Sequence, residues 1–493
     1  MTNATAMLPT TSRLLAGVQS ALGSIVASEQ LSKASLARLA SIDFVLNEIR
    51  LRQDCSFYRD FYAKAHALAT RGMVLAKRSE AAPLPPPFGP EAAHDVISEA
   101  IEAAFAVLAD LVKANHGQES AAAADFLRAV VAIELEYYSH RTLTAPSGKP
   151  PALPRESTIS RERFAAYLLS KFPERQPELG SFIELVGGFQ KKTFMFDIAF
   201  ADGTAQSLVL RAEKPDRFVQ LDASAVTAEY EVVQILHDGG VPSARPMWIE
   251  PDESQLGCRF MVSEKMIGET LGSSLVSRDF SDETARSMAE TLAQVHRLPI
   301  DPFARSCLAP WMQWNKAQEN TGALMDFWRR QPWFGAVNAS PARARLVDWL
   351  ETNIPLENAP VCLLHTDYGP HNFLIHDERI SAVLDWENAR IGDPAEDLSY
   401  LLQCLGDRAD RANIVKWYED AAGWKISPTR LQYFDVYNNI KLLLGSAFAS
   451  ALYEHDPEAD IEWCNIGLFT ARYGLARLQN DIDVADAHLA RLA

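Results

Sequence analysis

Residues 365–372 read His-Thr-Asp-Tyr-Gly-Pro-His-Asn, and the triplet Asp-Trp-Glu begins thirteen residues further on, at Asp385. The first segment offers a carboxylate, Asp367, and an amide, Asn372, five positions apart. Phosphoryl transfer from ATP needs such a set, because one carboxylate orients and deprotonates the attacking hydroxyl while an amide oxygen and a second carboxylate hold Mg²⁺ on the phosphates. The pattern therefore predicts Asp367 as the catalytic base and Asn372 and Asp385 as the metal ligands.

The sequence around these residues predicts a strand, a turn and a hairpin. Apolar residues 361–364 lead into the motif, and residues 373–375 and 380–384 form two further short apolar runs, the second of which ends at Asp385. Tyr368-Gly369-Pro370 has the composition of a turn. Taken alone, Asp-x-x-x-x-Asn is usually an ordinary loop, but this arrangement would fold the three polar side chains onto one spot.

The wording of the two segments is close to that of protein kinases, which have H-R-D-x-x-x-x-N and D-F-G. Here the segments are H-T-D-x-x-x-x-N and D-W-E, followed by Gly392-Asp393-Pro394-x-x-Asp397-Leu398. They resemble the aminoglycoside phosphotransferase-like branch of the kinase fold over roughly residues 180–475. The resemblance implies an α+β bilobal fold with an antiparallel β N-lobe and a mostly helical C-lobe. It also implies that Asp397 ties the catalytic loop and that His365 is structural.

Residues 186–194 read Val-Gly-Gly-Phe-Gln-Lys-Lys-Thr-Phe and resemble the Gly-Gly-x-Ser-Asn-x-Thr hairpin of the same family, with Gln190-Lys191 in place of Ser-Asn. Gly187 and Gly188 would let the backbone approach the nucleotide phosphates. Lys191 would add positive charge there, although an exposed lysine at a hairpin tip is an equal alternative. A Walker A loop is excluded, because its glycines do not stand at the required positions.

The cation of the third strand is an arginine in this chain. In kinases a lysine there pairs with the phosphates and with a helix glutamate; the equivalent residues would be Arg211 and Glu229. Arginine at this position also occurs in the branch that resembles the kinase-like domains of acyl-CoA-dehydrogenase fusion proteins. Residues 260–268 resemble the hinge between the lobes, whose backbone from Glu264 to Met266 would bind the adenine edge. The alternative is an ordinary edge strand.

The chain divides into four expected parts. Residues 1–141 predict a bundle of about five helices, because apolar residues recur at helical spacing in segments 12–28, 35–52, 57–76, 91–115 and 120–140. A linker rich in Pro, Ser and Gly follows at 142–160, then a kinase-like N-lobe at 161–266 and a C-lobe with the catalytic loop at 267–493. Glu134, Glu136 and His140 have possible metal-ligand spacing, but a solvated helix face is expected because no matching motif exists on another helix.

Composition narrows the class of partner. The chain has 493 residues and a net charge of −17, which argues against a nucleic-acid-binding footprint. It lacks an apolar run near the roughly 18 residues of a membrane span. Six scattered cysteines without a C-x-x-C pair favour reduced thiols and a cytoplasmic location. The expected partner is a small-molecule hydroxyl acceptor, not a nucleic acid or membrane, and a homodimer is left open.

The resemblance implies an ATP- and Mg²⁺-dependent phosphotransferase that acts on a hydroxyl group of a small molecule. A hydroxyacyl-CoA is the first expectation for the acceptor, and an aminoglycoside or macrolide antibiotic is the second. A catalytically silent, nucleotide-binding pseudokinase scaffold is the alternative from another class, although the complete set of three polar residues argues against it. Candidate acceptor contacts are Asp435, Asn438 and Asn439. Five tryptophans are expected in the core: Trp311, Trp314, Trp328, Trp333 and Trp349.

Overall fold

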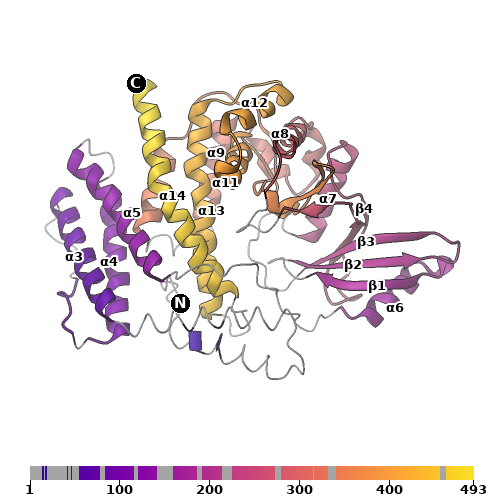
Figure 1. Ribbon diagram of the computed structural model, residues 1–493, viewed down its shortest axis with the longest axis horizontal. Helices are drawn as coiled ribbons and strands as arrows, with labels where there is room; N and C mark the ends of the chain where they lie inside the picture. The colour runs from indigo at the N-terminus through magenta and orange to yellow at the C-terminus, as the bar shows by residue number, and fades with distance from the viewer. Residues whose placement is uncertain are drawn as a thin grey trace. The chain divides into compact units, whose positions relative to one another are not determined.

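The computed structural model assigns the chain to two compact units, each built from segments that are distant in the sequence. Unit 1 contains residues 1–150, 322–355 and 432–493, and unit 2 contains residues 151–321 and 356–431. Figure 1 labels their helices and strands. The structure describes residues 14, 15, 17, 18, 42, 46, 55–77, 84–90, 92–115, 120–141, 159–185, 191–213, 225–271, 279–314, 316–330, 340–455 and 462–492.

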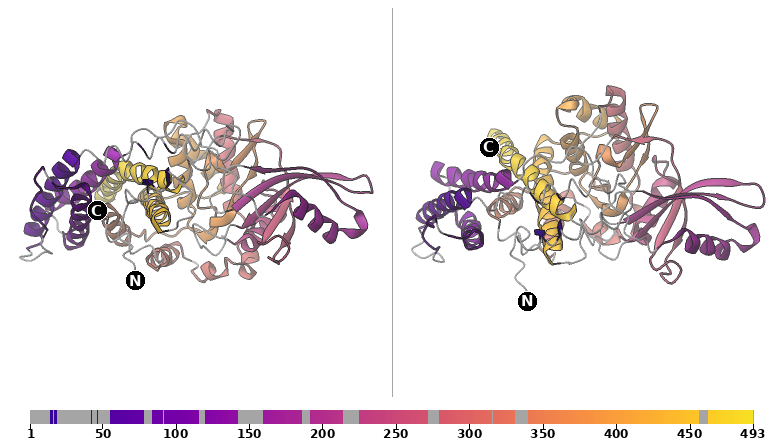
Figure 2. Two further views of the ribbon diagram at one scale, coloured as in Figure 1. Left: turned by 90° about the horizontal axis from the view of Figure 1, so that it is seen from below. Right: turned by 60° about the horizontal axis from the view of Figure 1, so that its bottom comes forward.

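Unit 2 contains a five-stranded antiparallel sheet in the order β1-β2-β3-β5-β4. Its strands are β1 (Glu178–Leu185), β2 (Lys191–Ala199), β3 (Ala205–Glu213), β4 (Pro246–Glu250) and β5 (Phe260–Glu264). Helix α6 (Arg161–Lys171) lies along this sheet (Figure 2). It begins after Ser160, whose side chain accepts a hydrogen bond from the N–H of Arg163 and so satisfies a free donor of the first turn.

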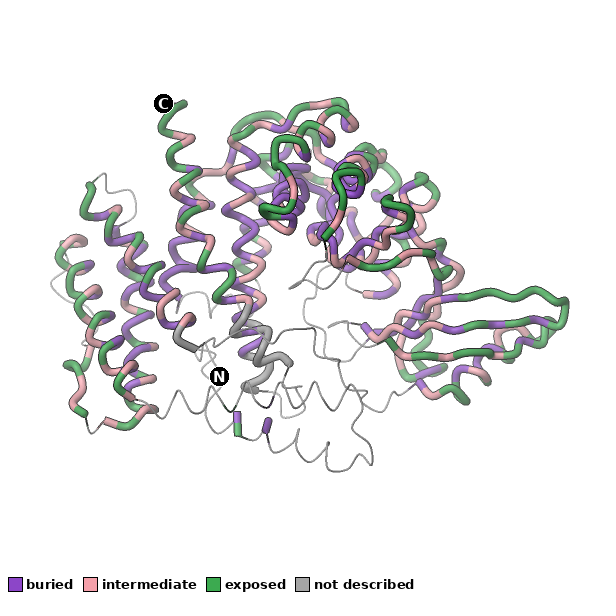
Figure 3. The backbone as a smooth tube through the Cα atoms, in the orientation of Figure 1, coloured by how far each residue is buried: buried purple, intermediate pink, exposed green. Residues whose placement is uncertain are grey.

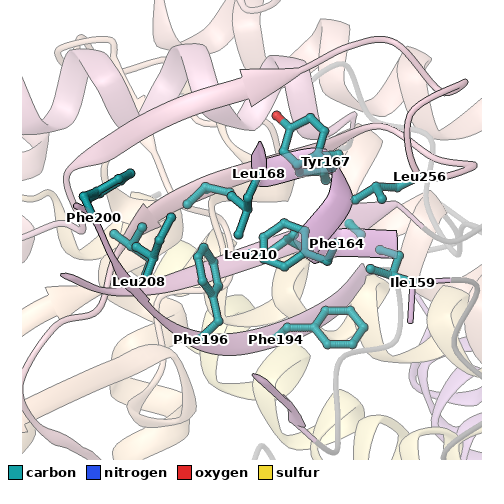
Figure 4. Packing of buried hydrophobic residues seen from close by; sticks show 14 residues of the cluster. Ile159, Phe164, Tyr167, Leu168, Phe194, Phe196, Phe200, Leu208, Leu210 and Leu256 are labelled. Atoms are coloured by element: carbon teal, nitrogen blue, oxygen red, sulfur yellow. The ribbon is translucent and has the colours of Figure 1, made fainter. Parts of the chain in front are cut away.

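An apolar core joins α6 to the sheet (Figure 4). Phe194 and Phe196 alternate along β2 and lie opposite Leu210 and Leu208 of β3, as the two-residue period of a strand requires. Phe164 of α6 packs edge-on against Phe196, with ring centroids 4.8 Å apart. Each such side chain contributes about 1.5–3 kcal/mol by leaving water. The core covers only part of the sheet, since β3 is exposed where it begins and buried where it ends (Figure 3).

The rest of unit 2 carries residues 365–372 and the Asp-Trp-Glu triplet at Asp385. A three-stranded sheet has the order β6-β8-β9, and β7 pairs with β10. These strands are β6 (Glu269–Thr270), β7 (Cys362–Leu364), β8 (Phe373–His376), β9 (Arg379–Val383) and β10 (Arg390–Gly392). The accompanying helices are α7 (Val226–Asp238), α8 (Asp282–His296), α11 (Ala395–Leu405) and α12 (Arg411–Ala422), with short 3₁₀ turns that include η6 (Pro370–Asn372) and η7 (Trp386–Asn388).

Unit 1 consists of helices in its described part. They are α3 (Cys55–Leu75), α4 (His94–Asn115), α5 (Ala121–Arg141), α10 (Pro341–Thr352), α14 (Glu462–Leu492) and most of α13 (Pro428–His455), whereas α9 (Ala317–Arg329) begins in unit 2 and ends in unit 1. Helices α4 and α5 pack against α10, and α5 also packs against α14. Residues from the two ends of the chain therefore share one core.

The expected α+β class is confirmed, and the strands of the expected N-lobe form an antiparallel sheet. Helices predicted at 57–76, 91–115 and 120–140 form, while 12–28 and 35–52 lie almost wholly outside the described residues, as do residues 142–158 of the expected linker. The compact units differ from the expected order of parts, because α10 and α14, assigned above to the C-lobe, pack with the N-terminal helices. Helical periodicity predicts that a face is buried but not which helix covers it.

The expectation of a solvated face on α5 is wrong for Glu134. Its side chain is buried, and its carboxylate accepts hydrogen bonds from Ser340 Oγ at 2.7 Å and from the N–H of Ala342 at 2.9 Å. Glu134 thus caps the beginning of α10 from another helix. Glu136 is partly exposed and pairs with Lys64. The side chain of His140 lies outside the described residues, and among those described no three metal-ligating side chains gather to hold an ion.

Within the described ranges, none of the helices combines the length and the apolar character that crossing a membrane requires.

Candidate active site

The catalytic loop is fixed by a buried carboxylate. Strand β7 leads into His365, and Asp397 in the first turn of α11 accepts the backbone N–H groups of His365 and Thr366, each at 2.7 Å. Thr366 has a φ of 66°, which a β-branched residue adopts only when its surroundings enforce it. The expectation that Asp397 ties this loop is confirmed.

His365 joins the same loop to the segment that precedes Asp385. Its Nε2 lies 2.7 Å from the carbonyl oxygen of Leu384, and the imidazole is fully buried beside the ring of Trp386. The expected structural role of His365 is therefore confirmed.

Asp367 lies at the centre of a hydrogen-bonded group. Asn372 Nδ2 donates to Asp367 Oδ2 at 3.0 Å and to its carbonyl oxygen at 2.9 Å, and His371 Nε2 lies 3.3 Å from Oδ2. Desolvation acts to raise the pKa of Asp367, although a third of its side chain is exposed. The charge and hydrogen bond of His371, with a hydrogen bond from Tyr400, outweigh desolvation and hold the pKa below the usual range. Asp367 is thus a fixed anion that faces solvent in part.

Asp385 is brought beside Asn372 by the β8–β9 hairpin. The N–H of Leu384 donates to the carbonyl oxygen of Asn372 at 2.8 Å. The residue that precedes Asp385 is therefore bonded directly to Asn372. Asp385 has a φ of 67°, an uncommon left-handed conformation that is often found at functional sites. Burial acts to raise its pKa, but the positive charges of Arg211 and Lys191 outweigh it, and the pKa is lowered.

The carboxylate of Asp385 belongs to a cluster with two further carboxylates and two cations. Arg211 Nη2 lies 2.6 Å from Asp385 Oδ1 and 3.3 Å from Glu229 Oε1. Lys191 Nζ lies 2.7 Å from Glu387 Oε2 and 2.9 Å from Glu229 Oε2. The first of the two lysine contacts is a hydrogen bond, while the second has the length of an ion pair without the orientation of a hydrogen bond.

The charges in this cluster shift one another's pKa values. Burial and the neighbouring Asp385 raise the pKa of Glu387 to about 7, although Lys191 and Arg211 act to lower it. Burial lowers the pKa of Lys191, but its two carboxylate partners outweigh burial and raise it. Such a combination of desolvation and specific charge partners is typical of functional sites.

The structure places Lys191 differently from either expectation for it. It is the first residue of β2 and is buried, so it is not an exposed lysine at a hairpin tip. The expected pairing of Arg211 with Glu229 is present, and Lys191 shares the same glutamate. Glu387 was missed as a member of the site, although it is the third residue of the Asp-Trp-Glu triplet. Its position two residues after Asp385 was the only signal in the sequence.

The structure describes only some of the other residues that are expected to bind the nucleotide. Gly187 and Gly188 lie outside the described residues. At the expected hinge the N–H groups of Glu264 and Lys265 donate to the carbonyl oxygens of Arg245 and Ser207. Within the described part of the chain the N–H of Met266 meets no backbone acceptor.

The donor set fits one Mg²⁺ ion shared with nucleotide phosphates. Both hydrogen bonds of the Asn372 side chain use its nitrogen, so the oxygen that would bind a cation is not used in them. The hydrogen bond from Arg211 to Asp385 goes to Oδ1. Mg²⁺ takes one or two protein oxygen ligands together with phosphate oxygens and water in sites of this kind.

The candidate acceptor contacts belong to unit 1. Asn439 is buried, and its Nδ2 donates to Asp481 of α14 at 2.9 Å and to backbone carbonyl oxygens within α13. Asn438 is also buried, whereas Asp435 is partly exposed. Of the five tryptophans, three are buried as expected, Trp314 is partly exposed and Trp333 lies outside the described residues: the buried ones are Trp311, Trp328 and Trp349.

Comparison with known proteins gives one family match and several partial relatives. Residues 196–434 match the model of the "Phosphotransferase enzyme family". Acyl-CoA dehydrogenase family member 11 of Mus musculus is 30% identical over 207 residues, which are 41% of this chain and 26% of that protein. Acyl-CoA dehydrogenase family member 10 of the same organism is 27% identical over 303 residues, 60% of this chain and 26% of that protein. The chain thus spans about a quarter of the length of these relatives.

One solved structure that is similar to this chain is a putative aminoglycoside phosphotransferase from Ralstonia eutropha. It is 21% identical, with a TM-score of 0.49, and the match covers 65% of this chain and 98% of that one.

Proposed function

We propose, from the premise that residues 196–434 form a domain of the phosphotransferase enzyme family, that the protein transfers the γ-phosphoryl group of Mg·ATP to a hydroxyl group of a small molecule. The single observation that carries this proposal is the meeting of Asp367, Asn372 and Asp385. Hydrogen bonds join Asp367 to Asn372, and the chain next to Asp385 is bonded to Asn372. A carboxylate and two metal-ligating oxygen groups are the parts that such a transfer needs.

In this proposal each residue has a separate task. Asp367 orients the acceptor hydroxyl and accepts its proton, while Asn372 and Asp385 hold the Mg²⁺ ion, which neutralises charge on the transferred phosphoryl group. Arg211 contacts the nucleotide phosphates as a charge-assisted hydrogen-bond donor. The backbone from Glu264 to Met266 receives the adenine, and the N–H of Met266, which meets no backbone acceptor among the described residues, is one donor.

A hydroxyacyl-CoA is the acceptor that we favour. The support is the sequence similarity to acyl-CoA dehydrogenase family members 10 and 11 and the arginine at position 211. An aminoglycoside or macrolide antibiotic is the second candidate, supported by the family match alone.

The test is nucleotide binding followed by an acceptor screen. Mg·ATP should raise the unfolding temperature, since a ligand that binds the native state stabilises it by mass action, and ATP without Mg²⁺ should raise it less. ATP consumption is then measured with a panel of hydroxyacyl-CoAs, aminoglycosides, macrolides and simple alcohols. Absence of a shift at millimolar Mg·ATP would refute nucleotide binding. Binding without consumption of ATP on any acceptor would favour a pseudokinase.

A further inference from the structure

The two cations of the charge cluster differ in their freedom to reach a ligand. Lys191 and Arg211 extend from neighbouring strands, and Arg211 lies opposite Thr193, two residues along β2 from Lys191, so both side chains point to the same face of the sheet. The side chain of Lys191 is 3% exposed, whereas that of Arg211 is 18% exposed. Two carboxylates, on α7 and on η7, already hold the Lys191 ammonium group.

Arg211 uses only part of its guanidinium group within the site. Its contacts with Asp385, Glu229 and Glu387, at 2.6, 3.3 and 3.9 Å, are all made by Nη2. Among the described residues, the hydrogen bond that the Arg211 side chain makes is donated by Nη2, to Asp385. A guanidinium group presents its donors as a planar fork, so Nη1 is available to a phosphate while Nη2 holds Asp385.

The charges of the cluster explain why a second cation is needed. Three carboxylates against two cations leave one excess negative charge, at the place where a metal ion would bind Asp385. If Lys191 were removed, Arg211 would be the remaining cation of the cluster for the carboxylates of Glu229 and Glu387. Buried carboxylates that lose a partner are strongly unfavourable, so they would draw the guanidinium group away from Asp385.

Resting on the proposed function, we infer that Lys191 is a positioning residue: it neutralises Glu229 and Glu387 and thereby holds Arg211 free to bind Asp385 and the nucleotide phosphate, without itself touching the nucleotide. Two residues thus replace the lysine that contacts phosphate in kinases. One is an arginine that contacts the ligand, and the other is a buried lysine that binds the carboxylates which would otherwise pair with this arginine.

Charge rescue distinguishes this role from direct phosphate contact. Lys191→Met should weaken ATP binding by about 10- to 100-fold, the range usual for a lost outer-sphere partner. Adding Glu387→Gln removes the surplus carboxylate charge, so the double variant should recover most of the affinity. Lys416→Met is the matched control, because Lys416 is an exposed lysine of α12 paired only with Asp420, and it should bind ATP like the wild type.

A second measurement uses the unaltered protein and so does not depend on the variants folding. An acyl phosphate of ATP acylates lysine amines that lie beside the bound phosphates, and mass spectrometry locates the modified residue. The inference predicts that Lys191 is not acylated, since its ammonium group is buried between two carboxylates.

The outcomes separate the inference from the proposed function. Acylation of Lys191, or a double variant that is folded but binds ATP no better than Lys191→Met, would overturn the positioning role. Failure of the wild type to bind ATP would overturn the proposed function instead. In that case the unfolding temperatures without nucleotide still test the charge balance: recovery by Glu387→Gln of the stability lost in Lys191→Met supports it, and absence of recovery refutes it.

Discussion

A single substitution can separate the proposed role of Asp367 as proton acceptor from ATP binding. Asp367→Asn keeps the shape of the side chain and removes the proton acceptor, so turnover should fall by about 10²–10⁴-fold while ATP affinity stays near that of the wild type. Paired measurements of kcat and of the ATP dissociation constant check this, using whichever acceptor the screen identifies. Full turnover in Asp367→Asn would exclude Asp367 as the base, and loss of ATP binding would make it a metal ligand or a structural residue.

Replacing the two predicted metal ligands should reduce Mg²⁺-dependent turnover to different extents. Asp385→Ala should reduce Mg²⁺-dependent turnover more than Asn372→Ala, because a carboxylate brings charge to the cation and an amide brings one neutral oxygen. Asp385→Ala also removes the shortest of the carboxylate contacts of Arg211. Titration of activity with Mg²⁺ gives the comparison. Near-wild-type activity in both variants would show that the metal binds elsewhere.

The three residues proposed to carry the chemistry could be grouped from the sequence because they are close along the chain. Asp367 and Asn372 are five residues apart, and the register of β8 and β9, with Phe373 opposite Val383, returns the chain to them at Asp385. The partnership of Lys191 with Glu387 spans 196 residues and depends on how β2 meets the turn after β9. Spacing along the chain carries no information about such a pair, so it was missed.

Helix α10 depends on a carboxylate that it does not contain. Glu134→Ala should leave Ser340 Oγ and the N–H of Ala342 without their acceptor and should lower the free energy of unfolding by about 3–5 kcal/mol. Glu136→Ala, on the same helix but partly exposed and paired with Lys64, is the control and should cost about 1 kcal/mol or less. Urea denaturation of the three proteins measures both values. Equal costs would show that the buried cap contributes no more than a surface pair.

The same carboxyl group gives a dependence of stability on pH. Burial raises the pKa of Glu134, although Arg343, Ser340 and Ala342 act to lower it. Because the pKa is higher in the folded state than in the unfolded state, the stabilisation is present below the ordinary glutamate value and is lost as the pH rises through the folded value. The unfolding free energy of the wild type, relative to Glu134→Gln, should therefore fall as the pH rises above the ordinary glutamate pKa of 4.5. A relative stability that rises with pH would contradict the direction of the shift.

At the scale of the whole molecule, the resemblance predicted from two motifs and the kinase-like fold are confirmed by the family match over residues 196–434. The motifs recur as a set, so a few residues suffice to identify the family. The grouping of the N-terminal helices with α10 and α14 has no comparable signal, since amphipathic faces are alike in many helices. Sequence reasoning therefore predicted the resemblance and the kinase-like fold but not the composition of the two compact units.

This grouping changes the expected result of cutting the chain between residues 142 and 158. A protease site inserted there should give two fragments on a denaturing gel that elute together in size-exclusion chromatography, because α4 and α5 pack against α10 and α14. The hydrogen bonds Arg128–Asp483 and Glu134–Ser340 belong to that packing. Separate elution of two folded fragments would instead establish the N-terminal helices as an independent domain.

The hydrogen bond between Glu134 and Ser340 can form only late during synthesis of the chain. The two residues are 206 positions apart, and a ribosome adds about 5–20 residues per second, so Glu134 is made roughly 10–40 s before its partner exists. Asp483 of α14, which binds Arg128, follows later still. During this interval the apolar faces of the first helices lack the surfaces that bury them in the finished protein. The nascent chain should therefore be a client for chaperones that bind at the ribosome, and unit 1 can form its full core only after α14 has been made.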